Sequence, residues 1–539
     1  MQAHHTRSPH ILTYMVARLE VSSGNRVLEP CAGEGHFIDA ILRVAPAAEI
    51  DAYELDDRLA AALHEKYSGF TNVRVIAADT VEVAAGNLLR GSAAHYDRII
   101  ANPPYGAWQD YSRRRWLRRR YPGLYVRETY AVFLYQCIDL LAKNGRLVFI
   151  VPDTYLYLRL HEKLRRQILS KTLVEEIVIF PPRFFGGISF GYANLSVITL
   201  VSREVTDDDT HKIRVIRNLR SPDELALLIR DVGARKHWQI LEMTQNEVNA
   251  NPGHAFLLPE DSGLHRLLRT GRLTVGDIAD VVTGFYSGDD RRWLRCASRK
   301  VGRTSAYQAV DTTRIASNYG GSGDLSVTGI TGPKCFIPIV KGGAKPYVKP
   351  TEWYVDWSTT ALQEYTKPRP NKARFQNSRF YFQEGVALPM VSSKRATAAL
   401  LENRLFDQSI VGIFPHEQRL LLYLLGFFNS GVCMRLLRTI NPSANNSANY
   451  VKKLPFVWPS DHVLGEVSAL VENVVLSLRS GGSLAAHDQK KVDSIFERVY
   501  RRELRQAAWN PDASFAAASD TPLPPVTQAR AFLKGQGTW

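Results

Sequence analysis

The stretch Asn102-Pro103-Pro104-Tyr105 directly follows an apolar run typical of a buried strand. Two adjacent prolines fix two backbone torsions and remove two amide donors, and the residue before each proline is held extended. The result is a rigid turn that presents carbonyl oxygens and one side-chain amide. Because Asn-Pro also begins ordinary strand-ending turns, the stretch by itself fits either a structural turn or a fixed set of hydrogen-bond acceptors.

A second turn with chemical potential lies earlier, in "VLEPCAGEGHF", between an expected strand and an expected helix. Its glycines let the backbone approach a ligand closely, and the following helix offers free amides at its N-terminus. The third glycine of G-x-G-x-x-G is absent, and Glu29 and Glu34 flank the turn. These carboxylates disfavour a pyrophosphate and favour a cationic, phosphate-free cofactor; a tight turn without a ligand is the alternative.

Acidic residues follow the next two expected strands. Glu54 ends "AYE", where a carboxylate can accept two hydrogen bonds from a ribose diol. Asp79 ends "VRVIAAD", where it can accept a hydrogen bond from an exocyclic amine of adenine. Ligands of open α/β sheets bind beyond the carboxyl ends of the strands. Four such turns in order therefore predict one crevice shared by all of them.

The elements that position these turns belong to an α/β fold. Residues 21–205 alternate short apolar strands with helical patterns, which predicts a mostly parallel sheet covered on both faces. Residues 1–205 are therefore expected to form one domain, with residues 206–259 as a linker or small subdomain. Residues 260–460 are irregular and rich in glycine and aromatic residues, typical of a separate α+β domain. Residues 461–539 are expected to form helices and a mobile tail.

The amino-acid composition limits the kinds of partner that the protein is expected to bind. The 539 residues carry a formal net charge of +15 with a pI near 9.5, which favours a polyanionic partner, and nucleic acid before a membrane surface. Five dispersed cysteines without CxxC spacing indicate reduced thiols, and the histidines lack metal-ligand spacing. No apolar run approaches the roughly 18 residues of a membrane span. We therefore expect a cytoplasmic protein without a metal or a membrane anchor.

The order of the four turns resembles S-adenosylmethionine-dependent DNA adenine-N6 methyltransferases of the restriction–modification and phage-defence type. The resemblance covers most of residues 1–460 and is specific in the first half. It implies a Rossmann-like domain with a mostly parallel seven-stranded sheet and a C-terminal α+β target-recognition domain. The segment "HTRSPHILTYMVARL" resembles the family's N-terminal cofactor-binding segment, with Ser-Pro in place of the usual Thr-Pro. The implied S-adenosylmethionine-binding residues are Thr6, Pro9, Glu29, Pro30, Cys31, Ala32, Gly33, Gly35, Glu54, Leu55, Asp79, Thr80 and Asn102.

The resemblance also assigns the catalytic turn, Asn102, Pro103, Pro104 and Tyr105. The Asn102 side-chain oxygen and the Pro103 carbonyl each accept a hydrogen of the adenine amine and stabilise the positive charge that develops on the nitrogen. The base has to leave the duplex, because its amine is otherwise inaccessible. Tyr105 is expected to stack on the flipped base, with Phe190 on its other face and Phe185 as the second choice.

Basic segments are the expected DNA contacts. Six arginines follow the catalytic turn in "YSRRRWLRRRY", where the family's DNA-contacting loop lies: Arg113, Arg114, Arg115, Arg118, Arg119 and Arg120. A charge run is more often a solvated face, yet its place beside the proposed base site favours phosphate contact. In the C-terminal half, lysines interleave with aromatic residues in "VKGGAKPYVKPTEW", which fits a groove-facing strand or a surface hairpin equally.

The leading interpretation is a site-specific methyltransferase acting on double-stranded DNA, with a cognate restriction endonuclease or defence-complex subunits as further partners. Two alternatives keep the motifs but change the role: a methyltransferase acting on RNA adenine, or a specificity subunit of a defence complex. A fused nuclease is disfavoured, because the faint match at Asp461 and "DQK" falls in expected helices. A long asymmetric recognition domain makes a monomer plausible.

Overall fold

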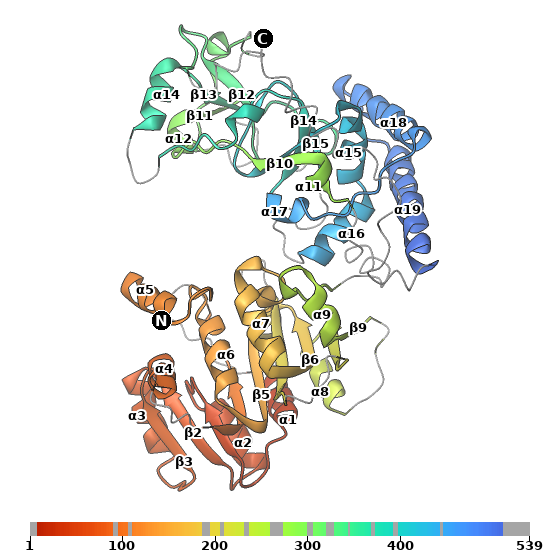
Figure 1. Ribbon diagram of the computed structural model, residues 1–539. Coiled ribbons are helices and arrows are strands. Elements are labelled where there is room, and N and C mark those ends of the chain that lie inside the picture. Colours follow the sequence, from red (N-terminus) through yellow and green to blue (C-terminus); the bar gives the residue numbers. More distant parts are fainter. Residues whose placement is uncertain are drawn as a thin grey trace.

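The computed structural model describes most of the chain: residues 8–89, 95–105, 110–185, 194–204, 210–230, 235, 237–258, 273–298, 306–317, 319, 328–342, 345–367, 372–391, 397–441 and 446–509. Figure 1 shows two bodies. One hydrophobic core joins residues between Ile11 and Leu258, and two further large cores lie between Val275 and Tyr500. The first body is therefore one domain, and the second is built around two neighbouring cores.

The first domain is a nine-stranded sheet with helices on both faces (Figure 1). Its strands are β1 Arg26–Glu29, β2 Glu49–Glu54, β3 Val73–Ala77, β4 Tyr96–Ala101, β5 Leu141–Pro152, β6 Thr172–Phe180, β7 Leu195–Ser202, β8 Lys212–Arg217 and β9 Gln239–Thr244. Its helices are α1 Pro9–Leu19, α2 His36–Val44, α3 Asp57–Lys66, α4 Thr80–Leu89, α5 Tyr111–Arg120, α6 Thr129–Asp139, α7 Glu162–Lys171, α8 Glu224–Ile229 and α9 Gln245–Ala250.

The strand order is β3-β2-β1-β4-β5-β7-β6-β8-β9. The first five strands are parallel to their neighbours, and β7 runs antiparallel between β5 and β6. Residues 147–151 of β5 are fully buried, as expected for a strand covered on both faces. The α/β class and the mostly parallel sheet agree with the expectation from the sequence, whereas the sheet has nine strands and not the expected seven.

The segment after residue 205 corrects the expected domain plan. Strand β8 pairs parallel to β6, and β9 pairs antiparallel to β8. Ile213, Val215 and Phe256 are fully buried in the first domain's core. The described residues 210–258 therefore extend the catalytic sheet instead of forming a linker. Polar residues at the start of this segment concealed two short strands, which are stabilised by pairing with distant parts of the chain.

The second domain contains two four-stranded sheets, ordered β10-β17-β14-β15 and β11-β13-β12-β16. Their strands are β10 Ala279–Thr283, β11 Leu294–Cys296, β12 Phe336–Val340, β13 Trp353–Asp356, β14 Gly385–Pro389, β15 Ala399–Leu401, β16 Leu405–Phe406 and β17 Ile410–Pro415. The helices of this domain are α11 Val275–Ile278, α12 Asp290–Trp293, α14 Thr359–Thr366, α15 Leu421–Phe428, α16 Gly431–Ile440, α17 Ala448–Val451, α18 Asp461–Arg479 and α19 Ala486–Trp509.

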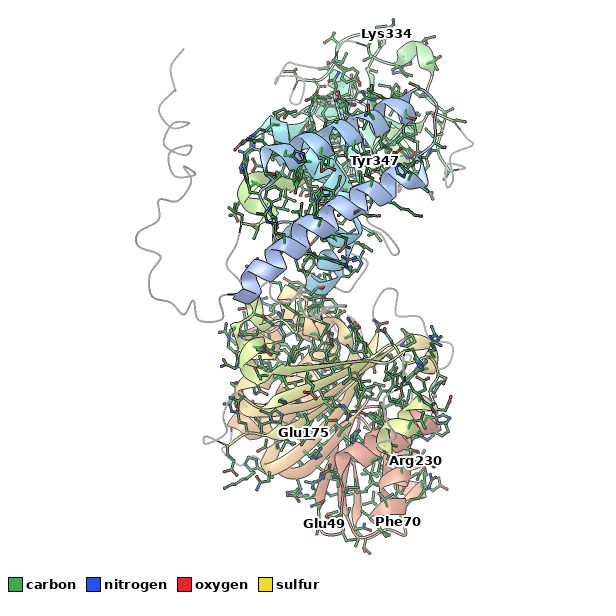
Figure 2. All side chains as sticks on the ribbon, turned by 90° about the vertical axis from the view of Figure 1, so that its right-hand side faces the viewer. Glu49, Phe70, Glu175, Arg230, Lys334 and Tyr347 are labelled. Atoms are coloured by element: carbon green, nitrogen blue, oxygen red, sulfur yellow. The ribbon has the colours of Figure 1, made fainter. Side chains whose placement is uncertain are left out.

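The two long C-terminal helices belong to this second domain. Helices α18 and α19 contact each other and lie across the face turned to the viewer in Figure 2. Val467, Val471 and Phe496 bury their side chains in the core of α15 and α16, and the Tyr347 hydroxyl donates to Gln489 Oε1 at 3.1 Å. The helices expected after residue 461 are thus part of the second domain, because they pack into its core.

No single helix in the described part of the chain has the length and apolar character needed to cross a membrane. The bent pair Gln418–Phe428 and Gly431–Ile440 passes the same test only when its two helices are taken together.

Candidate active site

The structure brings the four turns to one edge of the sheet. Strands β3, β2, β1 and β4 are consecutive neighbours and parallel, so their carboxyl ends lie side by side. Asp79, Glu54, Glu29 and Asn102 each stand at or just beyond one of these ends. The topology therefore creates the shared site that the sequence predicts.

The glycine turn after β1 is held from two sides. The Gly33 amide donates to Glu54 Oε2 at 2.7 Å, which ties the turn to the end of β2. At Gly35, φ is +78°, and a Cβ there would lie 2.6 Å from the Tyr67 hydroxyl. That hydroxyl donates hydrogen bonds toward the Gly35 carbonyl (2.9 Å) and Asp39 Oδ1 (2.7 Å). Tyr67, immediately after α3, is a supporting residue that the sequence motif did not reveal.

Glu29 at the end of β1 is a buried acid. Its side chain is almost fully enclosed, and Oε2 has no hydrogen-bond partner among the described residues. Burial, followed by the charges of Glu54 and Asp39, raises the pKa of Glu29 well above its ordinary value. A buried carboxyl oxygen without a hydrogen-bond partner among the described residues fits a donor or a cationic group of a ligand. It supports the expectation of a cationic, phosphate-free cofactor at this turn.

The other residues predicted to bind the cofactor differ in how exposed their side chains are. Glu54 accepts backbone amides from Gly33 and Asp56, and a carboxylate with about four lone-pair sites can still accept ribose hydroxyls. Leu55 is 54% exposed, so its side chain is available for an apolar contact. Thr80 is buried and donates its hydroxyl to the Pro30 carbonyl, a link within the site.

Three further residues are predicted to bind the cofactor: Pro9, Ala32 and Thr6. Pro9 is the first residue of α1. Ala32 is buried, and its amide donates to the Tyr53 carbonyl at 2.8 Å. Thr6 lies outside the described residues.

The catalytic turn is fixed by a buried hydroxyl. The Tyr105 oxygen lies 2.6 Å from Asn102 Oδ1 and 3.0 Å from the Ile150 carbonyl oxygen on β5. Burial raises the pKa of Tyr105 well above its ordinary value, so the phenol keeps its proton and can donate. Burial raises the pKa of the Cys31 thiol well above its ordinary value, and the nearby Asn102 backbone opposes the rise, so the glycine turn lies beside the predicted catalytic turn. Pro103 is buried and Pro104 is half-buried.

Tyr105 is 7% exposed, and its ring meets that of Tyr130 edge to face at 6.5 Å. Its hydroxyl contact with Asn102 is a positioning role that the sequence analysis did not identify. The signal was available, since a phenol three residues after an amide can reach back to it within a turn. The expected stacking of its ring on a base stays a prediction.

Phe190, with Phe185 as the second choice, is the residue expected to stack on the other face of the base. Phe190 lies outside the described residues. Phe185, the second choice, is buried in the core of the first domain at the end of the 3₁₀ turn Pro182–Phe185. As placed, Phe185 packs as a core residue, which disfavours it as a stacking surface.

A buried acid follows the neighbouring strand β5. Asp153 accepts hydrogen bonds from the Tyr157 hydroxyl and the Asn194 side-chain amide, both at 3.1 Å. Burial raises the pKa of Asp153 to about 6, and these hydrogen bonds oppose the rise. The motif-based analysis missed this residue, because an aspartate after a strand reads as an ordinary turn.

The arginine run forms helix α5, capped by Asp110, whose side chain accepts from the Arg113 amide at 2.7 Å. Leu117 is fully buried, and Arg113 and Arg120 are half-buried. Their spacing of four and three residues places them on one helix face. Arg114 is also half-buried, whereas Arg115, Arg118 and Arg119 are exposed. Arg113 forms ion pairs with Asp79 and Glu82. The expected phosphate contacts of the six arginines stay a prediction.

The lysine-rich segment of the second domain joins the antiparallel strands β12 and β13, as in the hairpin alternative, but it is not a surface hairpin, because most of its named side chains are buried or paired. Lys349 is buried and donates to the Lys341 carbonyl at 2.8 Å. Lys341 pairs with Asp290 at 2.6 Å, and Tyr347 and Trp353 are buried. Most of these side chains therefore stabilise the domain instead of facing a partner.

The comparisons with known proteins agree with this site. Residues 49–185 match the family described as Eco57I restriction-modification methylase. The type II methyltransferase M.AccI from Acinetobacter calcoaceticus is 27% identical over 256 residues, which is 46% of this chain and 44% of that protein. The type II methyltransferase M.HincII from Haemophilus influenzae is 24% identical over 187 residues, which is 33% of this chain and 34% of that protein.

A solved structure resembles nearly the whole chain in fold. A nuclease-deletion mutant of the type ISP restriction-modification enzyme LlaGI, in complex with a DNA substrate mimic, superposes with a TM-score of 0.51 at 13% identity. The likeness covers 87% of this chain and 55% of that one. At this identity the likeness concerns the fold alone.

The fold and the site define a Rossmann-like methyltransferase domain. The sequence matches support a methyltransferase domain of the restriction–modification type, and they imply S-adenosylmethionine as its cofactor. The chain spans less than half of the length of these two curated relatives.

Proposed function

We propose that this protein is a site-specific DNA methyltransferase that transfers the methyl group of S-adenosylmethionine to the N6 amine of adenine. The observation that carries the proposal is the Asn102–Tyr105 turn at the end of β4, beside the glycine turn of β1. The Asn102 backbone lies near enough to the Cys31 thiol to act on the pKa of that thiol, so the two turns lie side by side. The methyl acceptor and the methyl donor would thus meet at one edge of the sheet.

Each part of the catalytic turn has a defined task. The adenine amine is a poor nucleophile, because its lone pair is delocalised into the ring, so it has to be held in line for attack. Asn102 Oδ1 and the Pro103 carbonyl accept its hydrogens and stabilise the charge that develops on the nitrogen. Tyr105 holds the Asn102 side chain through its hydroxyl, and the two prolines keep both acceptors from moving.

The cofactor would be held by the acids of the neighbouring strands and would supply an electrophilic methyl group. Glu54 accepts from the ribose hydroxyls, Asp79 accepts from the adenine amine, and Leu55 contacts the adenine ring. Oε2 of the buried Glu29 has no hydrogen-bond partner among the described residues, which leaves this oxygen available to a cationic ligand.

Double-stranded DNA is the proposed substrate, with the target base flipped out of the helix. The net charge of +15 and the exposed arginines of α5 supply phosphate contacts near the catalytic turn. The second domain, with its two sheets, is the proposed target-recognition domain. We place the protein in a restriction–modification or phage-defence system, with a separate nuclease or defence subunits as partners.

The proposal is tested by expressing the protein in a host without adenine methylation and sequencing the genome by a single-molecule method that detects N6-methyladenine. We expect methylation confined to one short motif, and none with Asn102→Ala. The control is cofactor titration of Asn102→Ala, which should bind S-adenosylmethionine with the affinity of the wild type. Activity retained by Asn102→Ala would refute its role. An unmethylated genome with intact cofactor binding would point to RNA or to a subunit that needs partners.

A further inference from the structure

Helix α5, which carries the arginine run, contacts the proposed cofactor-binding residues through Arg113. Arg113, in the first turn of α5, forms an ion pair with Asp79 Oδ2 and lies 3.6 Å from Glu82 Oε1. Burial lowers the pKa of Arg113, but the hydrogen bond and charge of Asp79 outweigh it and raise the pKa overall. Arg113 is therefore a charged side chain in contact with the Asp79 carboxylate, which follows β3.

This contact leaves little of Asp79 for a ligand. Oδ1 accepts the Val81 amide at 2.9 Å, and Oδ2 is buried beside Arg113. The whole Asp79 side chain is only 11% exposed. A cofactor amine that approaches this carboxylate therefore meets an oxygen already covered by a guanidinium group.

Helix α5 connects this carboxylate to the proposed DNA contacts. Figure 1 shows α5 at the edge of the first domain that faces the second domain, above α4. Leu117 anchors the same face as Arg113 in the core, while Arg115, Arg118 and Arg119 face solvent. Helix α5 thus contacts a carboxylate of the proposed cofactor site on one face and exposes a cluster of arginines on the other.

We propose that the Arg113 guanidinium occupies the position on Asp79 that the adenine amine of the cofactor takes when it binds. On cofactor binding, the guanidinium leaves Asp79 and contacts a DNA phosphate instead. This inference rests on the proposed function, which assigns that amine to Asp79 and DNA to α5. Cofactor binding releases Arg113 toward the phosphates, and DNA binding in turn vacates Asp79. By linkage, each ligand raises the affinity for the other by the same factor.

The test is calorimetric titration of S-adenosylmethionine into the full chain, with and without a DNA duplex that contains the methylated motif. Arg113→Ala is expected to bind the cofactor about fivefold more tightly than the wild type in the absence of DNA, the scale of a partly exposed ion pair. The tightening of cofactor binding by DNA is expected to shrink in the variant. Arg113→Gln, which keeps most of the side chain, serves as a second variant with the same expectation.

Two controls separate the exchange from a general charge effect. Arg119→Ala removes the same charge from the exposed side of α5 and is expected to leave cofactor affinity in the absence of DNA unchanged. In an Asp79→Ala background, Arg113→Ala is expected to have no further effect, because the shared acceptor is gone. Equal or weaker cofactor binding by both Arg113 variants overturns the exchange. Absence of cofactor binding by the wild type and all variants overturns the proposed function itself.

Discussion

Tyr105→Phe separates two roles of the catalytic tyrosine. The substitution keeps the ring, which is expected to stack on the base, and removes the hydroxyl that contacts Asn102 Oδ1 and the Ile150 carbonyl. One hydroxyl hydrogen serves two acceptors, and the shorter contact, 2.6 Å, is the one to Asn102. If the hydroxyl positions the amide, its loss should slow methyl transfer although the stacking surface is intact.

The size of the effect follows from a single buried hydrogen bond, which contributes about 0.5–1.5 kcal/mol. That range predicts a kcat about three- to tenfold lower, since about 1.4 kcal/mol corresponds to a factor of ten in rate. The free energy of unfolding should fall by about 1 kcal/mol, because the buried Ile150 carbonyl loses a donor. Cofactor affinity should not change.

The assay is methyl incorporation into duplex DNA at saturating cofactor, together with urea unfolding of each variant. Tyr130→Phe is the matched control, because it removes a buried tyrosine hydroxyl that contacts Thr154 and His161. We expect similar losses of stability in the two variants and a reduced kcat only in Tyr105→Phe. Equal kcat values for both variants and the wild type would show that the ring alone matters.

Three further predictions concern binding, pH and the glycine turn. Replacing Arg118 and Arg119 by glutamine should reduce the slope of log K against log salt for DNA by about 2, roughly 0.9 per phosphate contact, and an unchanged slope would exclude both residues from phosphate contact. Burial raises the pKa of Asp153 to about 6 from 3.8, so the folded state holds the proton more tightly and loses stability as pH rises from about 4 to 6. Asp153→Asn should therefore gain stability over the wild type through that window, by up to about 3 kcal/mol in urea unfolding; a constant difference would refute the assignment. Gly35→Ala should weaken cofactor binding and lower stability more than Gly24→Ala, because both positions have positive φ but only a Cβ at Gly35 meets a tyrosine hydroxyl; equal thermal melts would contradict this.

The sequence by itself determined the parts that depend on neighbouring residues. Alternating apolar runs and helical patterns predict the α/β class, because the periodicity of a strand or helix is local. The two prolines after Asn102 make a rigid turn wherever the chain places them. The order of motifs along residues 29–105 then predicts a shared site, since parallel neighbouring strands end at the same edge.

Only the tertiary structure decided which residues pair across the chain. Strands β8 and β9 follow a polar stretch that resembles a linker. The pairing of β8 with β6, and of β9 with β8, is what makes them part of the sheet. Lys349 looks like a surface lysine in sequence but is buried with its ammonium on a backbone carbonyl. Arg113 is one arginine among six until helix α5 turns it onto Asp79. Such contacts depend on packing between distant segments, and local sequence patterns carry no information about them.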